Sequence, residues 1–174
     1  HIEGKGVAHD HRVDIRSLCS YIIDRTSIFK ILGCNLFETN LNNIQGIVET
    51  DPDAKWLSLN NQIDCGLLVA NGAPTINSVQ VIPNIELWEK LDPHNQYEEI
   101  YNRYAHLTVE ISEEDTKPEL AFLDHIILKL NPADLKKTGA QYILSPSPIS
   151  STDSYNLIQL YGANGHFIYQ VQYN

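Results

Sequence analysis

The stretch Pro83–His106, PNIELWEKLDPHNQYEEIYNRYAH, contains one of the two tryptophans of the chain and three of its nine tyrosines. Asn84 is a suitable N-cap for a helix over 85–90, because its side chain can accept a hydrogen bond from an early backbone amide. The Asp-Pro pair at 92–93 ends that helix, since the residue before a proline avoids helical backbone angles. A second helix is predicted over 95–105.

The second helix has one aromatic face and one polar face. At about 100° per residue, three ring side chains share one side, the expected core face: Tyr97, Tyr101 and Tyr104. On the other side, Asn102 and His106 are four residues apart and can present two hydrogen-bonding groups to one ligand. Arg103 is spaced to pair with Glu99. A solvated surface is the simpler interpretation, but together with Trp88 this face also suits a sugar or a polar headgroup.

The regions before and after this stretch mix strand and short-helix patterns irregularly. Before it, we predict a helix over 41–50, strands over 55–59 and 65–70, a turn at Asn71-Gly72 and an extended segment over 73–82. The segment 65–70, CGLLVA, is continuously apolar, which is typical of a strand covered on both faces.

After the stretch we predict strands over 106–111, 122–130 and 141–144, with a solvated acidic turn over 112–119. A short helix is expected between an Asn131 cap and a Gly139 cap, and a closing hairpin over 155–161 and 166–173. Because helices and strands do not alternate strictly, the sequence favours an α+β fold: a mostly antiparallel or mixed sheet with short helices packed on it. We expect an N-terminal arm over 1–39 and a single domain over 40–174.

The charge of the chain argues against two classes of partner. Its formal net charge is −10, with 22 Asp and Glu against 12 Lys and Arg. Nucleic acid and anionic membrane surfaces are bound through clustered Lys and Arg, so neither is an expected partner. No apolar run reaches the ~20 residues of a membrane span. The chain contains no methionine, and we expect it to be a processed or excised piece of a longer protein.

Cysteines and histidines give no indication of a metal or cofactor. Cys19, Cys34 and Cys65 include no C-x-x-C pair, which excludes zinc-ribbon and thioredoxin-type motifs. One internal disulfide and three reduced thiols both fit this count. The pair His9 and His11 is expected to be solvated rather than a metal site.

Known catalytic motifs are missing from the sequence, which has no G-x-S-x-G, H-E-x-x-H, G-x-x-x-x-G-K or G-x-G-x-x-G. Cys65 is expected to be a poor nucleophile, since its surroundings are apolar. Asp92 is interpreted as a helix stop and His125 as a hydrogen-bonded residue within a strand. We therefore predict no catalytic residue.

Five segments carry a resemblance to a known family. They are DPDAKW (51–56), LLVANGAPTINSVQVIPNIELWEKLDP (67–93), YEEIYNRYAH (97–106), LNPADLKKTGAQYILS (130–145) and HFIYQVQYN (166–174). Together they resemble the C-terminal extracytoplasmic domain of large multispanning bacterial membrane proteins, which are similar to C-type, lipid-sugar-dependent glycosyltransferases. The W-x-x-L-D-P and Y-N-R-Y-A-H pieces are the most specific. The resemblance covers roughly residues 40–174.

The resemblance implies a cell-membrane protein whose catalysis takes place outside this chain. The implied role is a non-catalytic domain that recognises a glycan, an acceptor or a lipid-linked sugar, or packs on the membrane-embedded part of the same polypeptide. The candidate ligand surface is Trp88, Asn102, Arg103 and His106, with Asn71 and Asn84 as neighbours. A structural domain without a ligand and a carbohydrate-active enzyme remain as alternatives.

Overall fold

The computed structural model describes residues 35–163 and 165–174. The apolar segment 15–32, the His9 and His11 pair, Cys19 and Cys34 lie outside the described residues. Most of the described part belongs to one compact unit, Thr39–Asn174.

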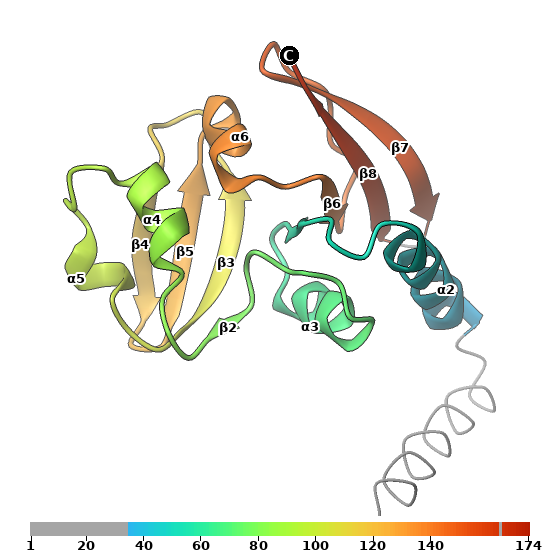
Figure 1. Ribbon diagram of the computed structural model, residues 1–174, viewed down its shortest axis with the longest axis horizontal. Helices are drawn as coiled ribbons and strands as arrows, with labels where there is room; N and C mark the ends of the chain where they lie inside the picture. The colour runs from blue at the N-terminus through green and yellow to red at the C-terminus, as the bar shows by residue number, and fades with distance from the viewer. Residues whose placement is uncertain (1–34, 164) are drawn as a thin grey trace, which may run out of the picture. The chain divides into compact units, whose positions relative to one another are not determined.

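The described helices and strands follow one another irregularly (Figure 1). The helices are α2 (Asn35–Thr50), α3 (Gln62–Ala70), α4 (Ile85–Leu91), α5 (Glu98–Tyr101), the 3-10 turn η1 (Pro132–Asp134) and α6 (Leu135–Thr138). The strands are β1 (Trp56–Ser58), β2 (Val79–Gln80), β3 (Ala105–Ile111), β4 (Lys117–Phe122), β5 (His125–Leu130), β6 (Tyr142–Ser145), β7 (Tyr155–Ala163) and β8 (His166–Tyr173).

The strands form two four-stranded sheets. The first, called the β1 sheet, has the order β1-β6-β8-β7, and the second, the β3 sheet, has the order β2-β3-β5-β4. Each contains one parallel pair, β1 with β6 and β3 with β5, and its other pairs are antiparallel. The predicted α+β class is confirmed, and the predicted C-terminal hairpin is the pair β7 and β8.

The end of β1 connects the two sheets through its backbone. Leu59 N donates to Leu144 O of the β1 sheet (2.9 Å), and Asn60 N donates to Val109 O of the β3 sheet (2.9 Å). Successive side chains of a strand point to opposite faces. Trp56 accordingly packs in one hydrophobic cluster, and Leu57 packs in another.

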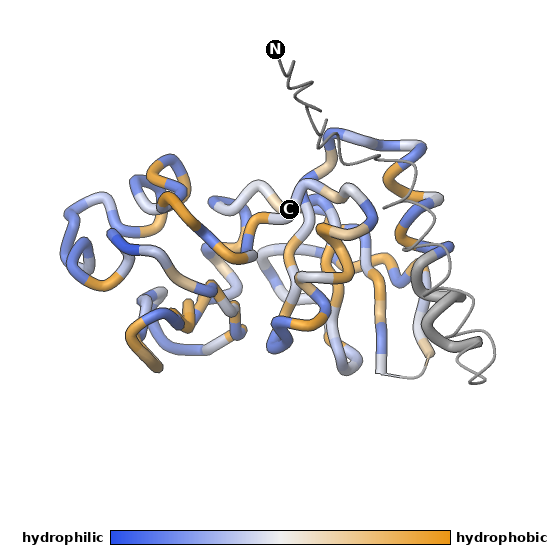
Figure 2. Tube along the Cα trace, turned by 90° about the horizontal axis from the view of Figure 1, so that it is seen from below, coloured by the Kyte–Doolittle hydropathy of each residue, from blue (hydrophilic) through white to orange (hydrophobic). Residues whose placement is uncertain are grey.

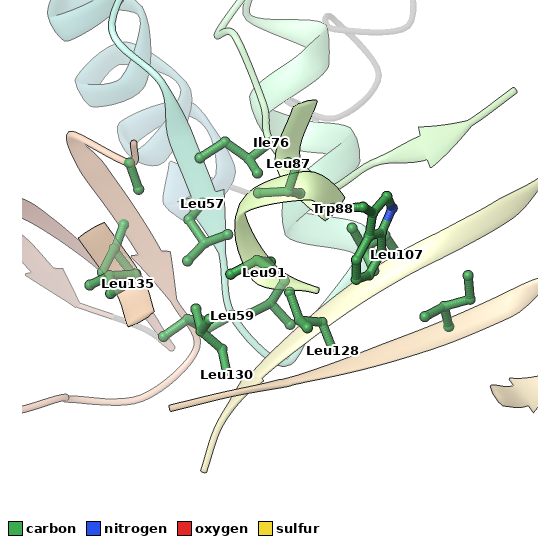
Figure 3. Close-up of a cluster of buried hydrophobic side chains, with 14 of the residues drawn as sticks. Leu57, Leu59, Ile76, Leu87, Trp88, Leu91, Leu107, Leu128, Leu130 and Leu135 are labelled. Carbon is green, nitrogen blue, oxygen red and sulfur yellow. The ribbon is translucent and has the colours of Figure 1, made fainter. Parts of the chain in front are cut away.

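The larger cluster contains side chains from both sheets and from α4. Figure 3 shows Leu87, Trp88 and Leu91 of α4 beside Leu107 and Leu128 of the β3 sheet. Apolar stretches separated by polar turns are visible along the trace in Figure 2. Burial of these side chains is the main favourable term in the stability of the fold.

The smaller cluster is built around Trp56, which stacks on Tyr142 with ring centroids 4.8 Å apart. Ile44 of α2 and Leu68 of α3 complete its buried centre. These two helices therefore pack against the same side of β1.

Three predicted caps are confirmed. Asn84 Oδ1 accepts a hydrogen bond from Leu87 N (3.2 Å), and Asn131 Oδ1 accepts one from Ala133 N (3.0 Å). Gly139 ends α6 with a φ of 73°, a left-handed angle that glycine adopts without a Cβ clash.

The segment CGLLVA is helical, so the predicted strand over 65–70 is wrong. It forms most of α3, whose N-cap Asn61 accepts a hydrogen bond from Ile63 N (2.8 Å). Leu67 and Leu68 are buried while Val69 is 54% exposed. Only one side of this apolar helix is therefore buried. The Asn-Gly pair that follows ends the helix and does not join two strands.

The predicted helix over 95–105 is also wrong beyond its centre. Only Glu98–Tyr101 is helical, and Ala105 already belongs to β3. Ala105 pairs with Gln80 of β2, and His106 pairs with Val79 of β2 and with His125 of β5, so the β3 sheet includes the end of the predicted helix.

The predicted strand over 122–130 corresponds to β5, but its start is three residues too early. β4 ends at Phe122, β5 begins at His125, and the intervening turn contains Leu123. Both apolar residues at this turn are exposed, Phe122 by 70% and Leu123 by 85%. The end of the predicted acidic turn, from Lys117 on, belongs to β4.

Candidate functional site

Trp88 is a core residue. It is 1% exposed, and its ring stacks on Tyr101 with a centroid distance of 4.5 Å and an interplanar angle of 7°. The indole nitrogen is buried without a hydrogen-bond partner among the described residues. Neither ring face is therefore open as a platform for a sugar.

The polar face predicted for the second helix does not form, because α5 ends at Tyr101. Asn102 is exposed at the C-terminus of α5, whereas His106 is half-buried in β3. Arg103 Nη2 donates to the backbone carbonyl of Glu99 instead of pairing with its carboxylate. Arg103 therefore closes the end of α5.

Asn71 and Asn84 both act as helix caps. The side-chain amide of Asn71 donates to Leu67 O (2.8 Å) at the end of α3, and Asn84 begins α4. The six predicted residues are thus distributed over separate places, and only Trp88 and Asn102 line a common hollow.

That common hollow, called the Trp88 hollow, has a volume of about 440 Å³. It is lined by Ile85, Trp88, Glu89, Pro93, Asn95, Glu98, Tyr101 and Asn102. The Asp92 carboxylate fixes one wall by accepting hydrogen bonds from Gln96 N (2.9 Å) and Tyr97 N (2.8 Å). Asp92 therefore does more than end α4, because it also holds the loop that leads to α5.

A second concave surface, called the α3 groove, lies between α3 and strands β2 and β3. It has a volume of about 490 Å³ and is lined by Gln62, Ile63, Cys65, Gly66, Val69, Ala70, Ser78, Val79, His106 and Leu107. None of these is Asp, Glu, Lys or Arg. Three apolar side chains on its rim are largely exposed: Ile63 by 74%, Val69 by 54% and Val79 by 47%.

Cys65 lines this groove as a buried, free thiol. Burial raises its pKa, and the nearby Asp64 charge raises it further, although a hydrogen bond with Ser58 opposes this. A thiol with a raised pKa is protonated at neutral pH and is a weak nucleophile. Cys65 lies in helix α3 and not in the predicted strand, and its low reactivity stays a prediction.

Asp64, which is buried, lies next to the partly exposed His166. The Asp64 Oδ1 atom lies 3.4 Å from His166 Nδ1, and the Asp64 side chain is 1% exposed. Burial raises the Asp64 pKa, while the charge of His166 and a hydrogen bond from Asn61 oppose the rise.

His125 occupies the structural position expected from the sequence. Its Nε2 atom lies 2.9 Å from Thr108 Oγ1 on the neighbouring strand, within hydrogen-bonding distance. In the described part of the chain, no three His, Cys, Asp or Glu side chains are close enough together to hold a metal ion. No helix among the described residues has the length and apolarity needed to cross a membrane.

Comparison with known protein families matches residues 38–174 to a family described as a domain of unknown function (DUF7654). The chain belongs to this family. No curated protein and no solved structure matches it. The DUF7654 region covers both sheets, α3 to α6 and most of α2.

Within the DUF7654 region, sequence reasoning missed the α3 groove because it assigned CGLLVA to a covered strand. The signal was present, since Asn61 before the run and Asn71 after it are both capping residues. A short helix in which six consecutive residues are apolar or small cannot bury all of them against one core, so part of its apolar surface is expected to be exposed. The partners of Asp64 and the grouping of surface lysines have no comparable sequence signal, because they depend on tertiary contacts.

Proposed function

We propose that this chain is a non-catalytic docking domain on the extracytoplasmic side of a cell-membrane protein. It binds the membrane-embedded part of the same polypeptide through the α3 groove. The observation that carries the proposal is the groove itself, which has exposed apolar side chains on its rim and no Asp, Glu, Lys or Arg in its lining.

The composition of the groove favours an apolar protein segment as the occupant. Charged residues make up 20% of the chain, so a concave surface without them differs from the rest of the molecule. Contiguous exposed apolar surface marks interaction sites in soluble proteins, and helices commonly bind such grooves through their apolar faces. A free sugar would instead need several polar groups pointing into the site.

The apolar strip continues beyond the groove toward α4. Val81 is 73% exposed, Ile82 is 80% exposed and Ile85 is 48% exposed. Together with Val79 they extend the contact area along the chain that connects β2 to α4. The resemblance to C-terminal domains of multispanning membrane proteins supports the choice of partner.

A photo-crosslinking experiment tests this proposal. The natural full-length protein is produced in membranes with a photoreactive amino acid at Val69, on the groove rim, or at Asp153, an exposed control position. We expect the Val69 probe to form an intrachain crosslink to a membrane-embedded segment, which mass spectrometry of the digested product identifies. Equal crosslinking from both positions, or crosslinks from Val69 only to other proteins, would refute the proposal.

The Trp88 hollow favours a second candidate, glycan recognition. It gathers the amides of Asn95 and Asn102 and the carboxylates of Glu89 and Glu98 above the buried rings of Trp88 and Tyr101. Amide and carboxylate groups provide the directional hydrogen bonds that sugar hydroxyls require. Its volume of about 440 Å³ is within the usual range of about 300–1,000 Å³ for ligand sites.

A glycan array with two variants tests this candidate. If the hollow binds a glycan, Asn102→Ala should weaken binding about tenfold, whereas Asn156→Ala, an exposed amide in β7, should leave it unchanged. Both substitutions are at exposed positions, so the melting temperature should not change. No binding by the unmodified protein, or equal binding by both variants, would eliminate the Trp88 hollow as a sugar site.

A further inference from the structure

Three lysines from different parts of the chain line one hollow. This lysine hollow has a volume of about 170 Å³ and is lined by Lys55, Pro74, Thr75, Ile76, Asn84, Glu86, Leu87, Lys90, Lys137 and Thr138. The whole chain has 12 Lys and Arg against 22 Asp and Glu. A site with three ammonium groups and one carboxylate in its lining therefore reverses the charge balance of the molecule.

The fold holds the three lysines at defined places. The backbone of Lys55 is fixed on both sides, because Lys55 N donates to Gln141 Oε1 (3.2 Å) and Gln141 N donates to Lys55 O (2.8 Å). Lys90 is in α4 and Lys137 is in α6, and these two helices pack side by side (Figure 1). Leu87 of α4 and Leu135 of α6 both belong to the larger hydrophobic cluster (Figure 3).

The ion pairs around the hollow leave positive charge uncompensated. Lys90 Nζ lies 2.7 Å from Glu86 Oε1, and Lys137 Nζ lies 2.7 Å from Asp134 Oδ1. Lys55 takes part in no ion pair among the described residues. The hydrogen bond and charge of Lys90 lower the pKa of Glu86, and the Lys55 charge adds to this effect. The three ammonium groups thus have two neighbouring carboxylates, those of Glu86 and Asp134, and one positive charge remains unmatched.

We propose that the lysine hollow binds a phosphate group. A phosphate monoester carries a charge of about −1.5 to −2 at pH 7 and accepts several hydrogen bonds. Three lysines supply point charges and donors for it. The volume of about 170 Å³ lies below the range of about 300–1,000 Å³ that is typical of sites for whole ligands. The hollow therefore binds either free phosphate or only the phosphate group of a larger molecule.

This site is independent of the docking proposal, because the lysine hollow and the α3 groove share no lining residue. Two sources could supply the phosphate: a soluble phosphate compound or the headgroup of an anionic lipid. The overall charge of −10 opposes nonspecific binding of any anion to the protein. Binding of a phosphate compound or an anionic lipid would therefore indicate binding at the lysine hollow.

NMR titration at constant ionic strength tests the proposal. The probes are inorganic phosphate, glycerol 3-phosphate, and phosphatidylcholine vesicles with and without phosphatidic acid. We expect chemical-shift changes in the amides of Thr75, Asn84 and Thr138 with the phosphate probes and none with chloride. Shifts with the soluble probes identify a soluble ligand, and binding only to phosphatidic acid vesicles identifies a lipid headgroup.

Two pairs of variants separate the site from a general charge effect. Lys55→Ala should weaken binding about fivefold or more, whereas Lys136→Ala, an exposed lysine of α6 outside the hollow, should have no effect. Glu86→Gln removes the competing carboxylate and should strengthen binding, whereas the exposed control Glu113→Gln should not. No binding to any phosphate probe, or equal effects within each pair, would overturn the proposal.

Discussion

At the scale of single residues, Tyr173 shows how one hydroxyl connects the last strand to the rest of the core. Its hydroxyl donates to Ala140 O (2.5 Å) and lies 3.4 Å from Leu135 O. Burial raises the pKa of Tyr173 from 10.0 to about 12. The residue therefore joins β8 to the end of α6 as a neutral hydrogen-bond donor.

We expect Tyr173→Phe to lower the free energy of unfolding by about 1 kcal/mol at pH 7, because a buried carbonyl loses its donor. The folded state keeps the phenolic proton that the unfolded chain loses above pH 10. The contribution of Tyr173 is therefore complete below pH 10 and decreases as the pH rises toward 12. Urea unfolding of both proteins from pH 7 to 11 measures this difference.

The control for this prediction is Tyr104→Phe, because Tyr104 is 51% exposed. This variant should retain the stability of the unmodified protein at every pH. A constant difference between Tyr173→Phe and the unmodified protein up to pH 11 would contradict the assigned pKa.

The residue scale is also where sequence reasoning was least successful for the candidate site. Trp88 and Asn102 do line one hollow, but Trp88 shows no open ring face and His106 lies elsewhere. The prediction assumed one continuous helix, and a helical wheel is valid only as far as the helix extends. Lys55, Lys90 and Lys137 were not found, since no periodicity relates residues so far apart in the chain.

At the scale of elements, a buried asparagine replaces a missing strand beside β1. Ser58 N donates to Asn77 Oδ1 (2.9 Å), and Asn77 Nδ2 donates to Ser58 O (2.7 Å). Both residues are fully buried. The side-chain amide thus satisfies the backbone groups that an edge strand would leave unpaired.

Asn77→Ala should lower the free energy of unfolding by about 3 kcal/mol, because it leaves one buried N–H and one buried C=O without partners. The matched control Asn156→Ala removes an exposed amide and should change stability by less than about 0.5 kcal/mol. Guanidinium titrations of the two variants provide the comparison. A loss of similar size in both would mean that the Asn77 bonds add little.

The elements were predictable where local chemistry determines them. The Asn84 and Asn131 caps depend on neighbouring residues and were predicted correctly. α3 was missed because an apolar run alone does not distinguish a buried strand from a short helix. β4 was missed because its first residues, Lys117, Pro118 and Glu119, continue the charged, proline-containing pattern of the turn before them.

At the scale of the whole domain, the two sheets are expected to unfold together. Leu59 is 1% exposed and belongs to the larger cluster, and its backbone bond to Leu144 lies next to the Asn60 bond to Val109. Leu59→Ala should therefore destabilise both sheets at once, by about 3 kcal/mol.

Each cluster has its own tryptophan, so cooperativity can be measured directly. Trp56 reports on the smaller cluster and Trp88 on the larger. Two variants of the Leu59→Ala protein each keep one tryptophan: Trp56→Phe keeps Trp88, and Trp88→Phe keeps Trp56. In each, the unfolding midpoint from tryptophan fluorescence should equal the midpoint from far-ultraviolet circular dichroism. Separate midpoints for fluorescence and circular dichroism would show that the sheets unfold independently.

The parallel pairing of β1 with β6 also has a consequence for biosynthesis. The backbone partners Lys55 and Gln141 at the start of this pairing are 86 residues apart. A ribosome adds about 5–20 residues per second, so β6 is synthesised roughly 4–17 s after β1. Throughout that interval β1 lacks its partner strand, so an unpaired strand with the apolar side chains of Trp56 and Leu57 is open to a chaperone.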